Sequence, residues 1–91
     1  MQRHILDDVP FNETFRTCNG AVLNNLSELA TWLGGCSEYD FRYHVNTDHH
    51  KNDFAIWIRE SVQDSALAND LDGELDKARY LEKIRRRIKR L

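Results

Sequence analysis

The feature that most constrains the fold is the amphipathic pattern of residues 74–91 at the end of the chain. Leucine, isoleucine and alanine recur there every three or four residues, so a helix would carry them along one side. Basic residues fill most of the other side, namely Arg79, Lys83, Arg85, Arg86, Arg87, Lys89 and Arg90. We therefore expect a basic amphipathic C-terminal helix whose apolar stripe has to be covered.

Charge is divided unevenly between this helix and the rest of the chain. Residues 1–76 hold five Lys or Arg and fourteen Asp or Glu, a net charge of −9, whereas residues 77–91 hold eight and one, a net charge of +7. The basic side can pair with its own acidic domain, or it can contact the phosphates of nucleic acid or of an anionic membrane. Against DNA binding stands the repulsion between the acidic remainder and the phosphate backbone.

The apolar side of the same helix allows a further interpretation. Its residues fit the a and d positions of a short coiled coil: Leu81, Ile84, Ile88 and Leu91. This self-association stripe would project beyond the domain and pair with the same helix of a second subunit. The sequence thus leaves three roles open for the helix, which are internal packing, self-association and the binding of phosphates.

Four signals for the start of a helix stand in the rest of the chain, at Asn25, Ser37, Asp53 and Asp64. Asn25 and Ser37 are each followed three residues later by an acidic residue, as in a capping box. Gly34-Gly35 ends the first of these helices and leaves little room before the next. The predicted fold is all-α: a compact bundle of about four helices with steep crossings and a longer C-terminal helix.

We divide the chain into a loosely ordered N-terminal arm at residues 1–14, a helical core domain at residues 15–71 and the basic C-terminal helix at residues 72–91. Within the core domain, Phe15 to Cys18 alternates large and polar side chains, which suits an extended segment, and Asn19-Gly20 ends that segment with a turn. Since a lone strand would have no partner, we expect coil packed on helices rather than a sheet.

The histidines lie around the junction of two predicted helices. His44 would end one helix and Asp53 would cap the next, so an imidazole–carboxylate contact could set the angle between them. An alternative is a divalent metal site built from His44, His49, His50 and Asp53, with Asp48 nearby, because imidazole and carboxylate are good ligands for zinc or iron. No H-x-x-x-H, H-E-x-x-H or C-x-x-C spacing supports that site, and no other cofactor is indicated.

Apolar residues follow Asp53 at helical spacing, and several of them are aromatic. We expect Phe54 and Trp57 to be buried, and Trp32, which is off the main stripe of its helix, to be the exposed aromatic residue.

Several short motifs resemble a small, uncharacterised family of prokaryotic domains. They are F-x-Y-H-V at Phe41–Val45, N-D-F-A-x-W-I at Asn52–Ile58, D-x-x-L-A at Asp64–Ala68, and upstream F-R-T-C-N-G at Phe15–Gly20 and L-x-E-L at Leu26–Leu29. The resemblance covers roughly residues 15–71. That family has no assigned activity, cofactor or catalytic residue, so the resemblance implies a compact domain and no particular chemistry.

An enzyme is the least supported class, because the sequence contains no nucleophile elbow, phosphate-binding loop or strong metal motif. Cys18 and Cys36 are too few for a disulfide framework, and the chain shows no signal peptide and no apolar run of about eighteen residues. We therefore expect a cytoplasmic protein without a transmembrane segment. Its predicted role is a small protein-interaction or regulatory module that acts through its C-terminal helix on a partner or on a second copy. A nucleic-acid-binding protein and a metal-binding protein are the alternatives.

Overall fold

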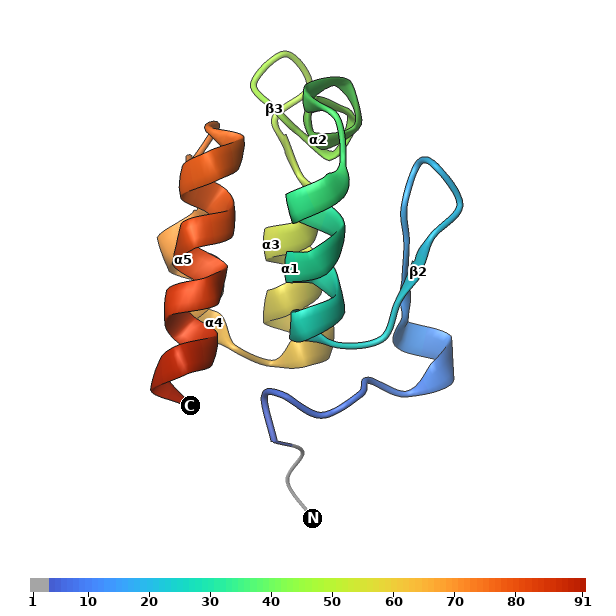
Figure 1. The fold of residues 1–91 in the computed structure, drawn as a ribbon, viewed down its shortest axis with the longest axis vertical. Helices are drawn as coiled ribbons and strands as arrows, with labels where there is room; N and C mark the ends of the chain where they lie inside the picture. The colour runs from blue at the N-terminus through green and yellow to red at the C-terminus, as the bar shows by residue number, and fades with distance from the viewer. Residues whose placement is uncertain (1–3) are drawn as a thin grey trace.

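The computed structural model describes residues 4–91, which fold into five α-helices and two short hairpins (Figure 1). The helices are α1 (Leu26–Gly35), α2 (Glu38–His44), α3 (Asp53–Trp57), α4 (Ser65–Leu71) and α5 (Lys77–Arg90). A π-helical turn, η2 (Ile58–Val62), continues α3, and a 3-10 helix, η1 (Phe11–Glu13), precedes the first strand. α5 packs along α1 and α4, and α2 lies across one end of the helical body.

The prediction of an all-α fold is wrong, because residues 4–91 also form two antiparallel hairpins. β1 (Phe15–Arg16) pairs with β2 (Val22–Leu23), and β3 (Val45–Asn46) pairs with β4 (Lys51–Asn52). The fold is therefore mixed, with helices predominating. The extended segment at Phe15 is a strand with a partner and not an isolated coil.

The partner of β1 lies immediately beyond the turn at Asn19-Gly20. Gly20 has a φ of 90°, which glycine adopts without the steric cost that other residues incur, and Thr17 N donates to Ala21 O at 2.9 Å. The chain reverses direction within a few residues, and Leu23, which is buried, anchors the hairpin on the helices. The turn residues are thus the middle of a hairpin and not the end of an isolated strand.

The second hairpin forms where we expected only a polar link between helices. Asn46 Oδ1 accepts a hydrogen bond from His49 N at 2.9 Å, and His50 adopts a left-handed φ of 51°. These local features close the loop, so that Val45 lies opposite Asn52. Because Val45 is buried, the hairpin ties the end of α2 to the start of α3.

Three helices are capped by the residues that the sequence indicates. Asn25, Ser37 and Asp64 each accept a hydrogen bond from the backbone N–H three residues later. For α3 the prediction is one residue off, because Asn52 is the N-cap and Asp53 is the first helical residue. The Asp53 carboxylate is therefore available for a contact outside its own helix.

Five helices and η2 enclose a single hydrophobic core. Its fully buried residues include Leu26, Leu29 and Leu33 of α1, Phe41 of α2, Phe54 and Ile58 of α3 and η2, Leu71 of α4, and Tyr80 and Ile84 of α5. α5 begins at Lys77 and is capped by Asp76. Because Tyr80 and Ile84 lie in the same core cluster, α5 shares one core with the preceding helices. Over residues 4–91, no helix combines the length and the apolar character needed to cross a membrane.

The aromatic residues are placed partly as expected. Phe54 and Trp57 are buried, as predicted. Trp32 is not the exposed aromatic residue, since it is half-buried and its indole N–H donates to the β1–β2 turn. The exposed rings on the helices are Tyr39 and Tyr43 of α2, whose spacing of one helical turn places them on the same side.

Candidate interaction surface on the C-terminal helix

The apolar stripe of α5 faces the interior of its own chain. Ile84 is fully buried, and Leu81 and Ile88 are half-buried against the core. Only Leu91, at the end of the chain, is exposed to 43%. The residues that fit a coiled-coil stripe are thus mostly covered by α1 and α4, and little of the stripe is left for a second subunit.

Two of the basic residues of α5 are bound within the domain. Arg87 Nε lies 2.8 Å from Asp64 Oδ2, and its Nη2 lies 3.2 Å from Asp64 Oδ1, while the Asp64 side chain is only 2% exposed. Lys83 Nζ lies 3.0 Å from Glu74 Oε1 and donates to the backbone oxygen of Asp70 at 3.0 Å. These two cations therefore hold α5 against α4 and the loop before α5.

Lys83 also sets the ionisation of its partner. The hydrogen bond from Lys83, which is the largest effect, lowers the pKa of the Glu74 carboxyl below its usual range. Glu74 is accordingly a carboxylate that stabilises the start of α5.

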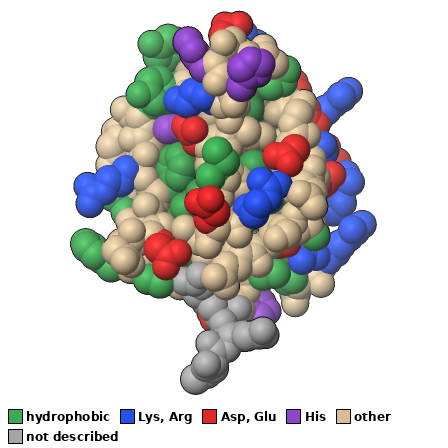
Figure 2. Space-filling model, turned by 180° about the vertical axis from the view of Figure 1, so that it is seen from behind, with side chains coloured by type: hydrophobic (Ala, Val, Ile, Leu, Met, Phe, Trp, Pro, Cys, Tyr) green, Lys and Arg blue, Asp and Glu red, His purple; other side chains and the backbone are tan. Residues whose placement is uncertain are grey.

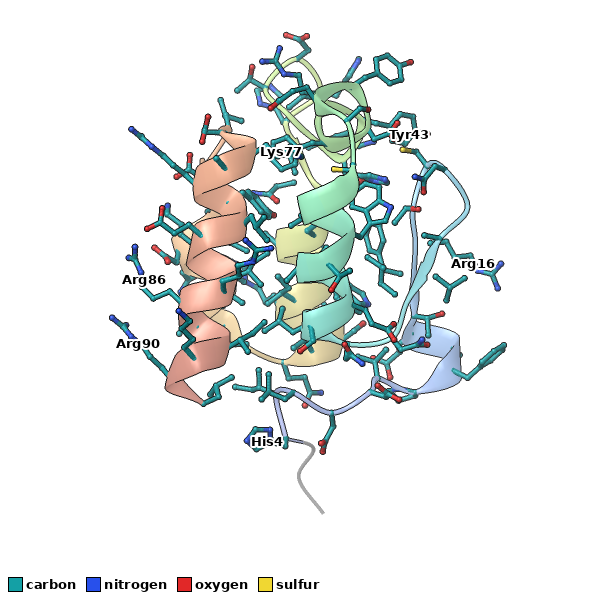
Figure 3. All side chains as sticks on the ribbon, viewed as in Figure 1. His4, Arg16, Tyr43, Lys77, Arg86 and Arg90 are labelled. Atoms are coloured by element: carbon teal, nitrogen blue, oxygen red, sulfur yellow. The ribbon has the colours of Figure 1, made fainter. Side chains whose placement is uncertain are left out.

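Five further basic side chains of α5 are exposed, namely Arg79, Arg85, Arg86, Lys89 and Arg90, and Lys77 at its start is half-buried. Arg86 has a surface ion pair with Glu82, one turn earlier, at 2.6 Å. Figure 2 shows basic side chains gathered along the edge of the molecule that α5 forms, and Figure 3 shows Arg86 and Arg90 pointing away from the helical body. The exposed set is the part of the predicted basic face that can meet a partner.

A groove of about 610 Å³ runs between α4 and α5 beside this exposed set. From α5 it is lined by Lys83, Arg86, Arg87 and Arg90, and from α4 by Ala66, Leu67, Asn69 and Asp70. One side of the groove is therefore strongly basic, and the other offers the apolar Ala66, the amide of Asn69 and the carboxylate of Asp70. Such a lining suits a chain segment that carries both carboxylates and apolar side chains.

His44, the central residue of the second candidate site, is buried and held from two sides. Its Nδ1 lies 3.0 Å from Asp53 Oδ2, and its Nε2 lies 3.0 Å from the backbone N of Cys18. Because the Cys18 N–H is a donor, Nε2 must be the acceptor, so the proton of the neutral ring is on Nδ1 and is donated to Asp53. The predicted contact between His44 and Asp53 is thus present, and it connects α2 to α3 and to the β1–β2 turn.

The remaining predicted metal ligands are not assembled around His44. His49 and His50 are exposed in the β3–β4 loop, and both ring nitrogens of His44 already take part in hydrogen bonds. Among residues 4–91, no group of three or more His, Cys, Asp or Glu side chains is arranged to hold a metal ion. His44, His49 and His50 are therefore close in the sequence but do not form a group of metal ligands in the structure.

The proximity of Cys18 to His44, which is bound in turn to Asp53, is an arrangement that spacing in the sequence did not reveal. Cys, His and Asp are the residues of a cysteine nucleophile with its base and orienting group. Here, however, the backbone N–H of Cys18 occupies Nε2 of His44, and partial desolvation together with Asp40 raises the pKa of the Cys18 thiol. A protonated thiol beside an occupied imidazole does not constitute an activated nucleophile.

Comparisons with known proteins agree with the motifs read from the sequence. A search of curated proteins and a search of solved structures each find no match. A family model described as "Family of unknown function (DUF5752)" matches residues 24–91, which is most of the chain. The match spans α1 to α5 and begins after the β1–β2 hairpin, so it extends further toward the C-terminus than the motifs did and leaves out F-R-T-C-N-G. The chain therefore belongs to the family of unknown function DUF5752.

Proposed function

We propose that this protein is a small interaction module that binds an acidic segment of a protein partner in the groove between α4 and α5. The observation that carries the proposal is the division of the cations of α5 into two groups. Arg87 and Lys83 bind carboxylates from other parts of the domain and Arg86 pairs with Glu82 of its own helix, whereas no ion pair joins Arg85, Lys89 or Arg90 to a carboxylate within residues 4–91.

The lining of the groove favours a protein segment as the ligand. The exposed Ala66 contributes apolar surface on the α4 side, which a segment with apolar residues between its carboxylates would cover. On the basic side, Arg90 would receive one carboxylate, and Arg86, one turn earlier, would receive another by exchanging its exposed pair with Glu82. Because an exposed ion pair contributes only about 0.2–1 kcal/mol, affinity has to come from several such pairs together with apolar burial.

The charge of the rest of the domain argues against a long polyanion. Residues 1–76 carry a net charge of −9, which would repel nucleic acid that extends beyond α5. A short acidic segment needs contact only with α4 and α5. The pair of free cysteines is in keeping with action in the reducing cytoplasm, where we expect this partner to be found.

A binding experiment with defined probes tests this proposal. The probe is a labelled synthetic helical peptide in which glutamates alternate with leucines, and a DNA duplex of equal charge is the comparison. Fluorescence anisotropy should show binding of the peptide that weakens with salt, and Arg90→Glu should reduce it roughly fivefold, because an attraction of about 1 kcal/mol is lost.

Arg16→Glu is the matched control. Arg16 is an exposed arginine on β1, on the other side of the molecule from α5, so the same change of charge there should leave peptide binding nearly unaltered (Figure 3). Equal effects of the two substitutions would show that net charge, and not the groove, governs binding. Stronger binding of the duplex than of the peptide would replace this proposal with nucleic-acid recognition.

A further inference from the structure

A second surface stands out at the end of the molecule formed by α2 and the β3–β4 hairpin. Tyr39 and Tyr43, one turn apart on α2, are 80% and 53% exposed, and Leu75, in the loop before α5, is 47% exposed. Lys51 Nζ lies 4.5 Å from the centroid of the Tyr43 ring and helps to hold that ring in place. Exposed tyrosines grouped in this way, next to arginine and leucine, are typical of the centre of a protein interface.

The shape of this end provides both a projection and a depression. Two adjoining grooves share Arg42, Asn46 and His49. One groove is completed by Tyr39, Tyr43 and Lys51, and the other by Val45, Thr47, Asp48 and Leu75. Tyr39, the most exposed of these side chains, therefore lines the first groove and not the groove at Leu75, and Arg42 belongs to both.

Charges of both signs are interleaved on this surface. Arg42 Nε lies 3.9 Å from Glu38 Oε2, one turn away on α2, and Lys51 Nζ lies 3.4 Å from Asp53 Oδ2. Two such surfaces do not repel each other when they meet. The exposed side of α5 is different, because it is mainly cationic and would repel the same side of a second copy.

We propose that the α2 end is the interface of a homodimer in which α2 of one subunit runs antiparallel to α2 of the other. A two-fold axis midway between Glu38 and Arg42 along α2 would place Arg42 opposite Glu38 of the partner subunit. It would also place Tyr39 of each subunit beside Arg42 of the other, at the edge of the groove that Leu75 lines. The self-complementary shape and the balanced charge meet the requirement of an isologous contact.

The area available on this surface is sufficient for such a dimer. Tyr39, Tyr43, Arg42, His49 and Leu75 together expose on the order of 600 Å² per subunit, which corresponds to an interface at the small end of the range for specific complexes. The dimer is accordingly in exchange with the monomer. This interface is distinct from the α5 surface and does not depend on the function proposed for it.

Sedimentation velocity of the full chain over a series of concentrations tests the proposal. The wild-type protein should shift from monomer toward dimer as its concentration rises. Arg42→Glu should raise the dissociation constant of the dimer roughly tenfold, because the carboxylate introduced at position 42 would then face Glu38 of the partner subunit. The double variant Glu38→Arg, Arg42→Glu should restore the dissociation constant to within about threefold of the wild type, because it inverts the pair without removing it.

Phe11→Ser is the matched control, since Phe11 is an aromatic residue that is 87% exposed but lies on η1. It should leave the dissociation constant unchanged, and thermal melting should show that all variants remain folded. A wild-type protein that stays monomeric at every concentration overturns the proposal. Dimerisation that survives Arg42→Glu, or that the double variant fails to recover, overturns it as well, and loss of the dimer with Arg90→Glu alone assigns self-association to α5.

Discussion

Arg86 and Arg87 are neighbours on α5, and each is paired with a carboxylate, yet replacing them with alanine should have very different effects. Arg87 binds Asp64, whose side chain is 2% exposed, through two nitrogens at 2.8 and 3.2 Å. Arg86 binds Glu82 at 2.6 Å, but both of these side chains are more than half exposed. Judged by distance alone, the Arg86–Glu82 ion pair would contribute more to stability than the Arg87–Asp64 pair. Because Asp64 is buried, we expect the opposite.

The expected magnitudes follow from what each substitution leaves behind. Arg87→Ala strands a buried carboxylate without its cation, which typically costs about 3–5 kcal/mol. Arg86→Ala leaves Glu82 in water, so the loss should stay below about 1 kcal/mol. For a domain of this size, each kcal/mol lowers the melting temperature by about 4–8 °C, so Arg87→Ala should melt at least about 12 °C below the wild type.

Asp64 has a second role that permits a sharper test. Its Oδ1 also accepts the backbone N–H of Leu67, so it is the N-cap of α4. Asn is as good an N-cap as Asp but carries no charge. Adding Asp64→Asn to Arg87→Ala should therefore recover a large part of the lost stability.

Chemical denaturation and thermal melting of these variants decide the question. The reasoning about burial would be refuted by equal destabilisation from Arg86→Ala and Arg87→Ala. It would also be refuted if Asp64→Asn lowered the stability of the Arg87→Ala protein further.

Two more predictions concern the histidine contact and the start of α5. His44→Ala should destabilise the domain by about 2–3 kcal/mol, measured by urea denaturation, because it leaves a cavity, removes the acceptor of the Cys18 N–H and leaves Asp53 with Lys51 alone. Glu74→Gln should reduce the pH dependence of stability in acid: the lowered pKa of Glu74 stabilises the folded state above the unfolded-state pKa, and this contribution is lost as the pH falls through the folded-state pKa. Melting temperatures of both proteins along an acid pH series measure the second effect.

A control substitution and a contrary outcome can be stated for these two predictions. His49→Ala removes an exposed imidazole and should alter stability by no more than about 0.5 kcal/mol. An unchanged melting temperature for His44→Ala would rule out a structural role for the contact. A constant difference in stability between wild type and Glu74→Gln at all pH values would show that Lys83 does not lower the pKa of Glu74.

Capping is the part of the fold that the sequence predicts best, because a capping side chain bonds to a backbone N–H only three residues away. Asn25, Ser37 and Asp64 were all identified from such local patterns. Among the four caps indicated by the sequence, the error at α3, Asp53 in place of Asn52, has a tertiary cause. The Asn52 side chain also donates to Leu71 O and accepts from the Tyr80 hydroxyl, so contacts with α4 and α5 help to select it as the cap.

The hairpins were harder to predict, since each strand is only two residues long, and the alternation at Phe15–Cys18 indicated an extended segment but not its partner. Whether such short segments pair depends on residues that anchor them to the helices. For the two hairpins these are Leu23 and Val45, which are 4% and 2% exposed. Burial of this kind depends on the packing of distant helices and is not encoded in the turn residues.

The sequence by itself determined that the chain ends in a basic amphipathic helix, because helical periodicity and charge are properties of the residues alone. It also determined where most helices begin. Only the tertiary structure decided that Arg87 is a half-buried structural residue paired with the buried Asp64, while Arg86 and Arg90 face solvent. The physical reason is that successive residues point about 100° apart around a helix, and Asp64, which selects Arg87, comes from another helix that only folding brings into contact.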